Sequence, residues 1–138
     1  MFVSLHHGGL PTRDAARAKS FWCDVLGFVA FPAKDNWLGW GGVTYPVHLM
    51  PPDEASPGIS LSRHMAIEVD RLETVLIPLL KAGLAPFQAA LAGERQPILS
   101  PDQPLDFGIG TIFVHDPDGN VIEFVQKGRG IFTMLAQG

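Results

Sequence analysis

Four side chains of the kinds that bind divalent metals stand at matching places in the two halves of this chain. His7 and His48 belong to the first half, and His64 and Glu123 belong to the second. Imidazole and carboxylate ligands together suit zinc, nickel, cobalt, manganese and ferrous iron. Three neutral imidazoles and one carboxylate leave the site positively charged, which is the condition for stabilising negative charge on a substrate oxygen. The sequence therefore predicts one divalent metal per site, with two ligands from each half.

The landmarks around these residues indicate a weak internal repeat. An aspartate follows His7 after seven residues, and another follows His64 after six residues. Each half then continues with a helical pattern that ends at a glycine, Gly27 in the first half and Gly83 in the second. A repeat of this kind indicates a site built by pairing two similar modules.

The first module, residues 2–50, is predicted to be a βαβββ unit. Its expected elements are a strand over 2–9, a helix with Thr12 as N-cap that stops at Gly27, and strands near 28–31, 37–41 and 44–50. Residues 51–62 contain prolines and a glycine and are predicted to form an extended, fairly stiff linker.

The second module, residues 63–127, is predicted to repeat this order. Its expected elements are a strand over 62–69, a helix capped by Asp70 that stops at Gly83, an irregular stretch over 85–106, and strands over 110–115 and 120–126. A type I turn is predicted at Asp116-Pro117-Asp118-Gly119. The tail, 128–138, carries little pattern. Residues 1–138 are expected to form a single α+β domain.

Strand alternation restricts which side chains can share a site. His6 and His7 are neighbours, so only one of them can face a given side of a strand, and comparison with the second half favours His7. His48 and Glu123 both fall on the last predicted strand of their module. If all four candidates face the concave side of a curved sheet, they can meet at one metal.

Each candidate also has a purely structural interpretation. An isolated histidine on an apolar strand is commonly a hydrogen-bonded core residue, and this alternative stays open for His48 above all. His115 is interpreted as a support for the turn that follows it. Aromatic side chains that could line an apolar substrate pocket, or equally cover a core, are Trp37, Trp40, Phe107 and Phe113.

Composition excludes several classes of protein. The chain is 46% hydrophobic and 17% charged, which is sufficient for a packed core. A net charge of −4 argues against a nucleic-acid partner. No apolar run approaches the roughly 18 residues that span a bilayer, so no membrane partner is expected. The N-terminal residues lack a signal-peptide pattern, and the single Cys23 fits a reducing compartment, so a cytoplasmic protein with a small-molecule partner is predicted.

Several segments together carry a resemblance to a known family over residues 2–126. These segments are His7 with Asp14, Phe21-Trp22-Cys23-Asp24-Val25-Leu26-Gly27-Phe28, His64-Met65-Ala66-Ile67-Glu68-Val69-Asp70, and Asp116-Pro117-Asp118-Gly119-Asn120-Val121-Ile122-Glu123. The chain thereby resembles the vicinal oxygen chelate superfamily. That group includes glyoxalase I, methylmalonyl-CoA epimerase, extradiol dioxygenases, fosfomycin-resistance thiol transferases and bleomycin-binding proteins.

The resemblance implies a fold, an assembly and a ligand set. The fold is α+β, with two βαβββ modules forming a curved mixed-sheet cup, paired across a homodimer with shared sites. His7, His64 and Glu123 match the recurrent ligand positions, and His48 matches the remaining position of the first module. Glu123 and His48 are then the candidate catalytic groups.

The reaction stays open between three functions. A glyoxalase-type lyase or isomerase would act through a metal-stabilised enolate, although that pattern has a carboxylate where this chain has His48. A ferrous dioxygenase could use two histidines and Glu123 as its triad. The third function is a small-molecule-binding dimer, but such relatives lack the ligands that this chain retains. The thiol transferases are disfavoured because Gly9 stands where they carry a threonine.

Overall fold

The chain forms two compact units, each built around one β-sheet. The computed structural model describes residues 1–2, 4–52, 64–90 and 92–131. The division between the units falls between Gly58 and Ile59. Most of the predicted linker, residues 53–62, and most of the predicted tail, residues 132–138, lie outside the described residues.

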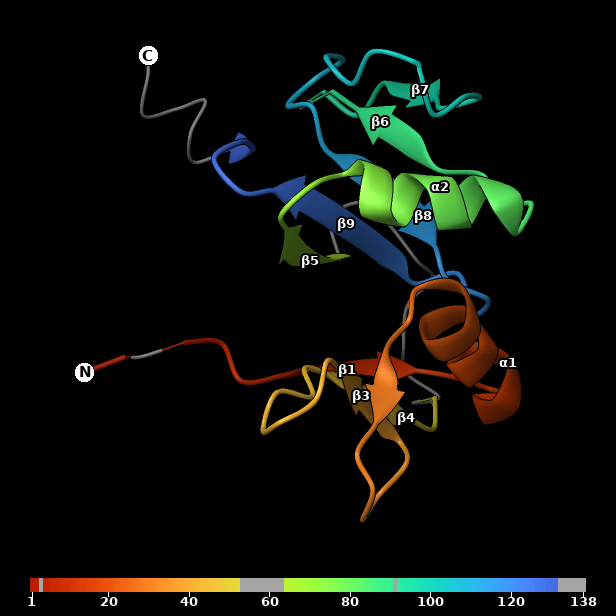
Figure 1. The fold of residues 1–138 in the computed structure, drawn as a ribbon, viewed down its shortest axis with the longest axis vertical. Coiled ribbons are helices and arrows are strands. Elements are labelled where there is room, and N and C mark those ends of the chain that lie inside the picture. Colours follow the sequence, from red (N-terminus) through yellow and green to blue (C-terminus); the bar gives the residue numbers. More distant parts are fainter. Residues whose placement is uncertain (3, 53–63, 91, 132–138) are drawn as a thin grey trace. The chain divides into compact units, whose positions relative to one another are not determined.

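The first unit has the predicted βαβββ order. Its elements are β1 (Gly8–Pro11), α1 (Ala15–Lys19), the π-helical η1 (Ser20–Val25), β2 (Val29–Ala30), β3 (Trp37–Gly39) and β4 (Val47–Met50). The sheet order is β1-β4-β3-β2, with β1 parallel to β4 and the other pairs antiparallel (Figure 1). Buried side chains come from the helical segment and from one face of this sheet: Ala18, Phe21, Trp22, Leu38, Val47 and Leu49.

Two predicted boundaries in this unit are wrong. The first strand begins at Gly8 and not at residue 2. Gly8 stands beside Val47, so the next partner back along β4 is Pro46, which has no N–H to extend the ladder. The N-cap of α1 is Asp14, whose side chain accepts the N–H of Arg17 at 3.1 Å. The predicted helix stop is confirmed, since Gly27 takes the left-handed φ of 79° after the helical segment.

The second unit repeats this order and adds one strand. Its elements are β5 (His64–Val69), α2 (Glu73–Lys81), β6 (Phe87–Ala89), β7 (Arg95–Pro97), β8 (Ile112–His115) and β9 (Val121–Gln126). The sheet order is β5-β9-β8-β6-β7, with β5 parallel to β9. In this sheet order, β5-β9-β8-β6 reproduces the order β1-β4-β3-β2 of the first sheet, and β7 is an additional edge strand.

The stretch predicted to be irregular, 85–106, contains both β6 and β7, so that prediction is wrong. Each of these strands has only three residues, which is too short for a period-two pattern to be recognised. Asp70 does not cap α2 either. The N-cap position belongs to Leu72, whose N–H is bonded by the Gln126 side chain at 3.1 Å. The turn before β9 is confirmed by the bond from the Gly119 N–H to the Asp116 carbonyl, 2.9 Å long.

Helix α2 covers one face of the second sheet (Figure 1). Its buried side chains are Val75, Leu76 and Leu79. Strand alternation turns Ile67, Ile112, Val114, Ile122 and Phe124 towards the same buried side. The alternate residues of these strands, which include His64, Phe113 and Glu123, therefore lie on the opposite face.

Candidate functional site

On the first sheet, His7 and His48 lie close together beside a tryptophan. Gly9 stands beside His48, two residues after His7, and β3 brings Trp37 opposite His48. The His48 ring stacks on the indole with centroids 3.7 Å apart and planes 8° apart. The His7 ring meets the indole edge-on at 4.6 Å and the His48 ring at 5.9 Å. The two imidazoles are therefore neighbours on one face.

On the second sheet, His64 and Glu123 form the equivalent pair. Ala66 stands beside Glu123, two residues after His64, and β8 brings Phe113 opposite Glu123. His64 Nε2 lies 3.1 Å from Glu123 Oε1. The His64 ring meets the Phe113 ring edge-on at 5.6 Å. The register thus places the two pairs, and the aromatic ring beside each, at matching positions on their sheets. Their role as metal ligands stays a prediction.

The Glu123 carboxylate is held from two sides. Its Oε2 accepts a hydrogen bond from Thr111 Oγ1 at 2.7 Å, while Oε1 faces His64. The Glu123 side chain is 8% exposed and that of His64 is 33% exposed. A charged carboxylate at such a buried place needs these partners, because removing it from water is costly. The hydroxyl of Thr111 therefore occupies one oxygen and leaves Oε1 as the one beside His64.

The separation of the donor atoms of His64 and Glu123 is compatible with a shared divalent metal. Two ligand atoms about 2.0–2.2 Å from one ion lie about 2.8–3.6 Å apart at octahedral or tetrahedral angles. The 3.1 Å between His64 Nε2 and Glu123 Oε1 falls in that range. Burial, the nearby His7 and the nearby Lys34 lower the pKa of His48, which favours the neutral imidazole that a metal requires. Among the described residues no three His, Cys, Asp or Glu side chains gather at one point as a metal would require. His6, predicted to face away from His7, has its Nδ1 2.9 Å from Nδ1 of His7.

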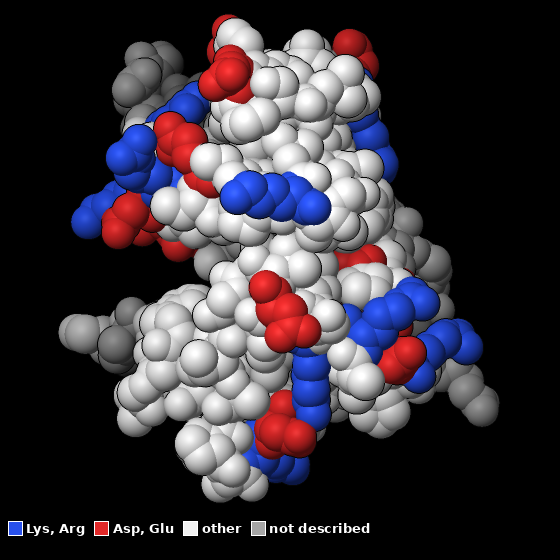
Figure 2. Space-filling view, turned by 45° about the vertical axis from the view of Figure 1, so that its right-hand side comes forward, with Lys and Arg blue, Asp and Glu red and all other residues white. Residues whose placement is uncertain are grey.

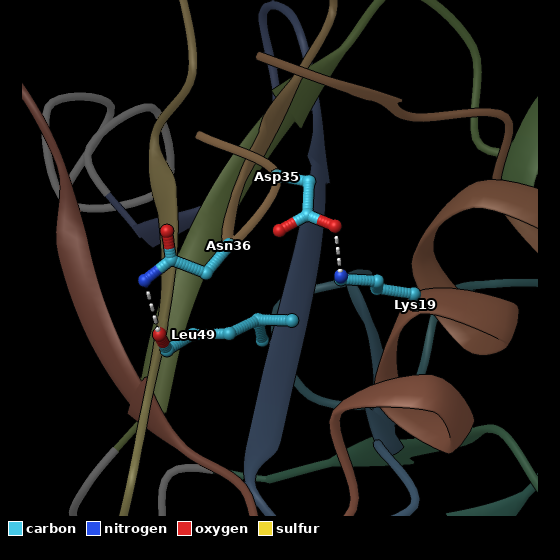
Figure 3. Close-up of polar contacts among 4 residues, drawn as sticks. All are labelled: Lys19, Asp35, Asn36 and Leu49. Atoms are coloured by element: carbon cyan, nitrogen blue, oxygen red, sulfur yellow. Dashed lines mark hydrogen bonds and ion pairs between the residues drawn. The ribbon is translucent and has the colours of Figure 1, made fainter. Parts of the chain in front are cut away.

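Polar contacts from the segment before β3 support the first pair. The Asn36 side chain donates a hydrogen bond from Nδ2 to the Leu49 carbonyl oxygen at 3.2 Å (Figure 3). The Asn36 carbonyl accepts the N–H of Leu49 at 2.8 Å. Lys19 Nζ lies 2.7 Å from Asp35 Oδ2 and links the same segment to the helix. These contacts fix the register that sets Trp37 opposite His48.

The predicted pocket aromatics separate into two groups. Trp37 and Phe113 stand beside the two candidate pairs. Trp40 is 58% exposed and meets Phe28 at 5.9 Å. Phe107 is half-buried in the loop before β8, where its N–H is bonded to the Gln88 side chain at 3.2 Å. The structure thus brings Trp37 and Phe113 to the candidate ligands and shows no such contact for the other two.

Three residues close to the candidate pairs, or on the same face, were not singled out from the sequence: Thr111, Phe87 and Arg95. Alternation along the predicted strand 110–115 would have placed Thr111 and His115 on the face of Phe113. His115, interpreted as a support for the turn, also has its ring 5.7 Å from that of Phe87. Phe87 and Arg95 fall in the stretch predicted to be irregular, where no pattern pointed to them.

The surface charge agrees with the composition. Figure 2 shows acidic and basic side chains intermingled over the face in view, without a continuous basic surface there. Such a distribution differs from the basic face of a nucleic-acid-binding protein. No helix in the described part of the chain is both long and apolar enough to cross a bilayer.

Comparison with known proteins supports the fold. A family model for the Glyoxalase/Bleomycin resistance protein/Dioxygenase superfamily matches residues 4–124. Trypanothione-dependent glyoxalase I of Leishmania major is 19% identical, with 99% of this chain and 92% of that chain covered and a TM-score of 0.55. The oxidase ChaP-H2 is 20% identical, with 92% and 95% covered and a TM-score of 0.59. TnmS3, an antibiotic-binding protein from Streptomyces sp. CB03234, is 20% identical, with 91% and 96% covered and a TM-score of 0.60. A comparison with curated proteins gave no match.

Proposed function

The chain belongs to the Glyoxalase/Bleomycin resistance protein/Dioxygenase superfamily, and on this premise we propose that it is a metal-dependent enzyme of glyoxalase type. Its substrate is a small molecule with two neighbouring oxygens, and its reaction is that of a lyase or isomerase. The observation that carries the proposal is the matched register of the pairs His7/His48 and His64/Glu123. Two equivalent pairs of donors, each beside an aromatic ring, fit a single site better than unrelated structural roles.

The four side chains share one task in this proposal, and two of them have a second. His7, His48, His64 and Glu123 would hold one divalent ion, which when bound would supply the Lewis acidity that polarises the substrate oxygens. Glu123 is also the first candidate for accepting the proton of the substrate carbon. Thr111 keeps Oε2 occupied, so the carboxylate presents one defined oxygen. His48 is a second candidate for proton transfer.

The proposal includes an assembly. Among the described residues neither sheet brings three such donors together, so a complete set needs both modules. We propose a homodimer in which His7 and His48 of one chain join His64 and Glu123 of the other, giving two sites. We further propose that residues 1–138 are one cytoplasmic domain, in keeping with the single Cys23.

The test compares metals and reactions on the same preparation. Protein stripped of metal is reloaded with zinc, nickel, cobalt, manganese or ferrous iron, and is assayed with hemithioacetals of methylglyoxal. We expect turnover with one or more of the first four ions and its loss in Glu123→Gln. A metal-loaded protein that turns over no hemithioacetal contradicts the glyoxalase-type reaction, and a protein that binds no metal contradicts the site.

A ferrous dioxygenase is the second candidate, because two histidines with Glu123 can supply the two-histidine, one-carboxylate set of such enzymes. Consumption of dioxygen with a catechol by the iron-loaded protein, together with inactivity towards hemithioacetals, would favour it. Tight binding of a small molecule without metal or turnover would instead indicate a binding protein.

A further inference from the structure

A second polar cluster lies on the second sheet, at a distance from His64 and Glu123. The guanidinium carbon of Arg95 stands 4.7 Å above the centre of the Phe87 ring. The His115 ring lies 5.7 Å from the same ring, and the Phe113 ring stacks on it at 5.6 Å. One phenyl ring therefore joins a cation, an imidazole and the aromatic ring beside Glu123.

The register places this cluster on the face that carries the candidate metal ligands. Phe113 stands opposite both Glu123 and Phe87. Arg95 pairs with Ala89, two residues after Phe87, and so shares its face. Strands lie about 4.8 Å apart, so the Phe87 ring that Arg95 covers is about 10 Å from the strand of Glu123. Between the two polar ends lie the apolar side chains of Ala89, Phe113 and Val121, all of which are buried.

Arg95 is prepared to bind an anion. Its side chain is exposed, and in the described part of the chain no carboxylate lies within ion-pair distance of it. The guanidinium lies over the Phe87 ring, and its N–H groups can act as a bidentate donor to a carboxylate or phosphate. His115 is half-buried beside it and offers a further ring nitrogen.

We propose that Arg95 and His115 form an anion subsite, and that the substrate is an organic acid. Its carboxylate or phosphate binds Arg95, and its neighbouring oxygens reach the His64 and Glu123 end, about 10 Å away. The inference rests on the proposed function for the identity of the metal end only. The anion subsite itself needs no metal.

Binding of a matched acid and amide tests the subsite. The probes are 4-phenylbutyrate and its uncharged analogue 4-phenylbutyramide, titrated calorimetrically into metal-free protein at low salt. We expect the acid to bind at least about tenfold more tightly than the amide, because a charge-assisted bidentate contact is worth that much. Arg95→Gln should abolish the preference, and Arg95→Lys should restore part of it. Phe87→Leu should weaken binding of the acid several-fold by freeing the guanidinium from its support.

Arg71→Gln is the matched control, because Arg71 is an exposed arginine of the same unit that pairs with Glu73 at 3.6 Å. It should keep the full preference for the acid. Equal affinity of the acid and the amide, no binding of either, or an equal loss in Arg71→Gln and Arg95→Gln would each overturn the proposal. If the protein prefers the acid over the amide but binds no metal, the anion subsite is supported and the metal site is refuted. Failure of the subsite and failure of the proposed function can therefore be told apart.

Discussion

Removing the hydroxyl of Thr111 should weaken both the fold and the metal site. Thr111→Val keeps the size and branching of the side chain but deletes the 2.7 Å bond to Glu123 Oε2. As whole residues, Thr111 is 1% exposed and Glu123 is 6% exposed, so water cannot readily replace the lost donor. A hydrogen bond to a buried charged group contributes about 1.5–3 kcal/mol, and the free energy of unfolding should fall by about that amount.

Metal affinity gives the second, more specific readout. A ligand carboxylate that loses its orienting partner typically loses about 10- to 100-fold in metal affinity. We therefore expect Thr111→Val to bind zinc about 10- to 100-fold more weakly than the parent, by competition with a chromophoric chelator. Thr111→Ser keeps the hydroxyl and should recover most of this loss.

The control is Thr74→Val, which removes a bond of the same length, from Thr74 Oγ1 to the Arg71 carbonyl, at an exposed place. Its unfolding free energy should change by no more than about 0.5 kcal/mol, and its metal affinity should not change. Urea unfolding of the metal-free proteins and metal titration check both effects. The reasoning is refuted if Thr111→Val keeps the parent's metal affinity, or if Thr111→Ser loses as much as Thr111→Val.

Three further outcomes follow from the same account. A crystal structure of the metal-loaded protein should show a ring nitrogen of His48 about 2.0–2.2 Å from the ion, and a His48 ring turned away from an occupied site would leave a three-ligand site. Mixing His7→Ala with Glu123→Ala under conditions of subunit exchange should restore metal binding in the heterodimer, whereas verified exchange without recovery would argue against shared sites. Burial raises the pKa of Asp116, so this carboxyl keeps its proton to a higher pH in the folded protein than in the unfolded chain. The free energy of unfolding should therefore fall as the pH rises from the unfolded pKa of Asp116 through its folded pKa. In Asp116→Asn, the urea midpoint should not show this pH dependence between about pH 3 and pH 7. If the difference in stability between parent and variant is the same at every pH, Asp116 does not have a raised pKa.

Much of the fold could be predicted from the sequence because its signals are local. The stops at Gly27 and Gly83 coincide with left-handed backbone, and the turn at Asp116–Gly119 forms as its residue types require. The predictions that failed have different causes. The late start of β1 is set by Pro46 on the neighbouring strand, and β6 and β7 are too short to show a period of their own.

The candidate site was predictable in part. Repeat spacing and strand alternation selected His7, His48, His64 and Glu123 as candidates, and the structure places the two members of each pair close together. Their role as metal ligands stays a prediction. The bond from Thr111 to Glu123 follows from strand pairing between β8 and β9, which no residue pattern specifies. The contact of Arg95 with Phe87 depends on the edge strand β7, which lies in a stretch predicted to be irregular.

The metal content of single-alanine variants shows whether both pairs hold the ion. The parent protein, and variants with alanine at His7, His48, His64 or Glu123, would be purified identically, exposed to equal zinc, dialysed and measured by elemental analysis. His115→Ala serves as the histidine control outside both pairs, and circular dichroism confirms folding. We expect one ion per chain in the parent and in His115→Ala, and a clear loss in His7→Ala as well as in His64→Ala and Glu123→Ala. Full metal content in His7→Ala, with loss only in the variants of the second sheet, would contradict a site built from both pairs.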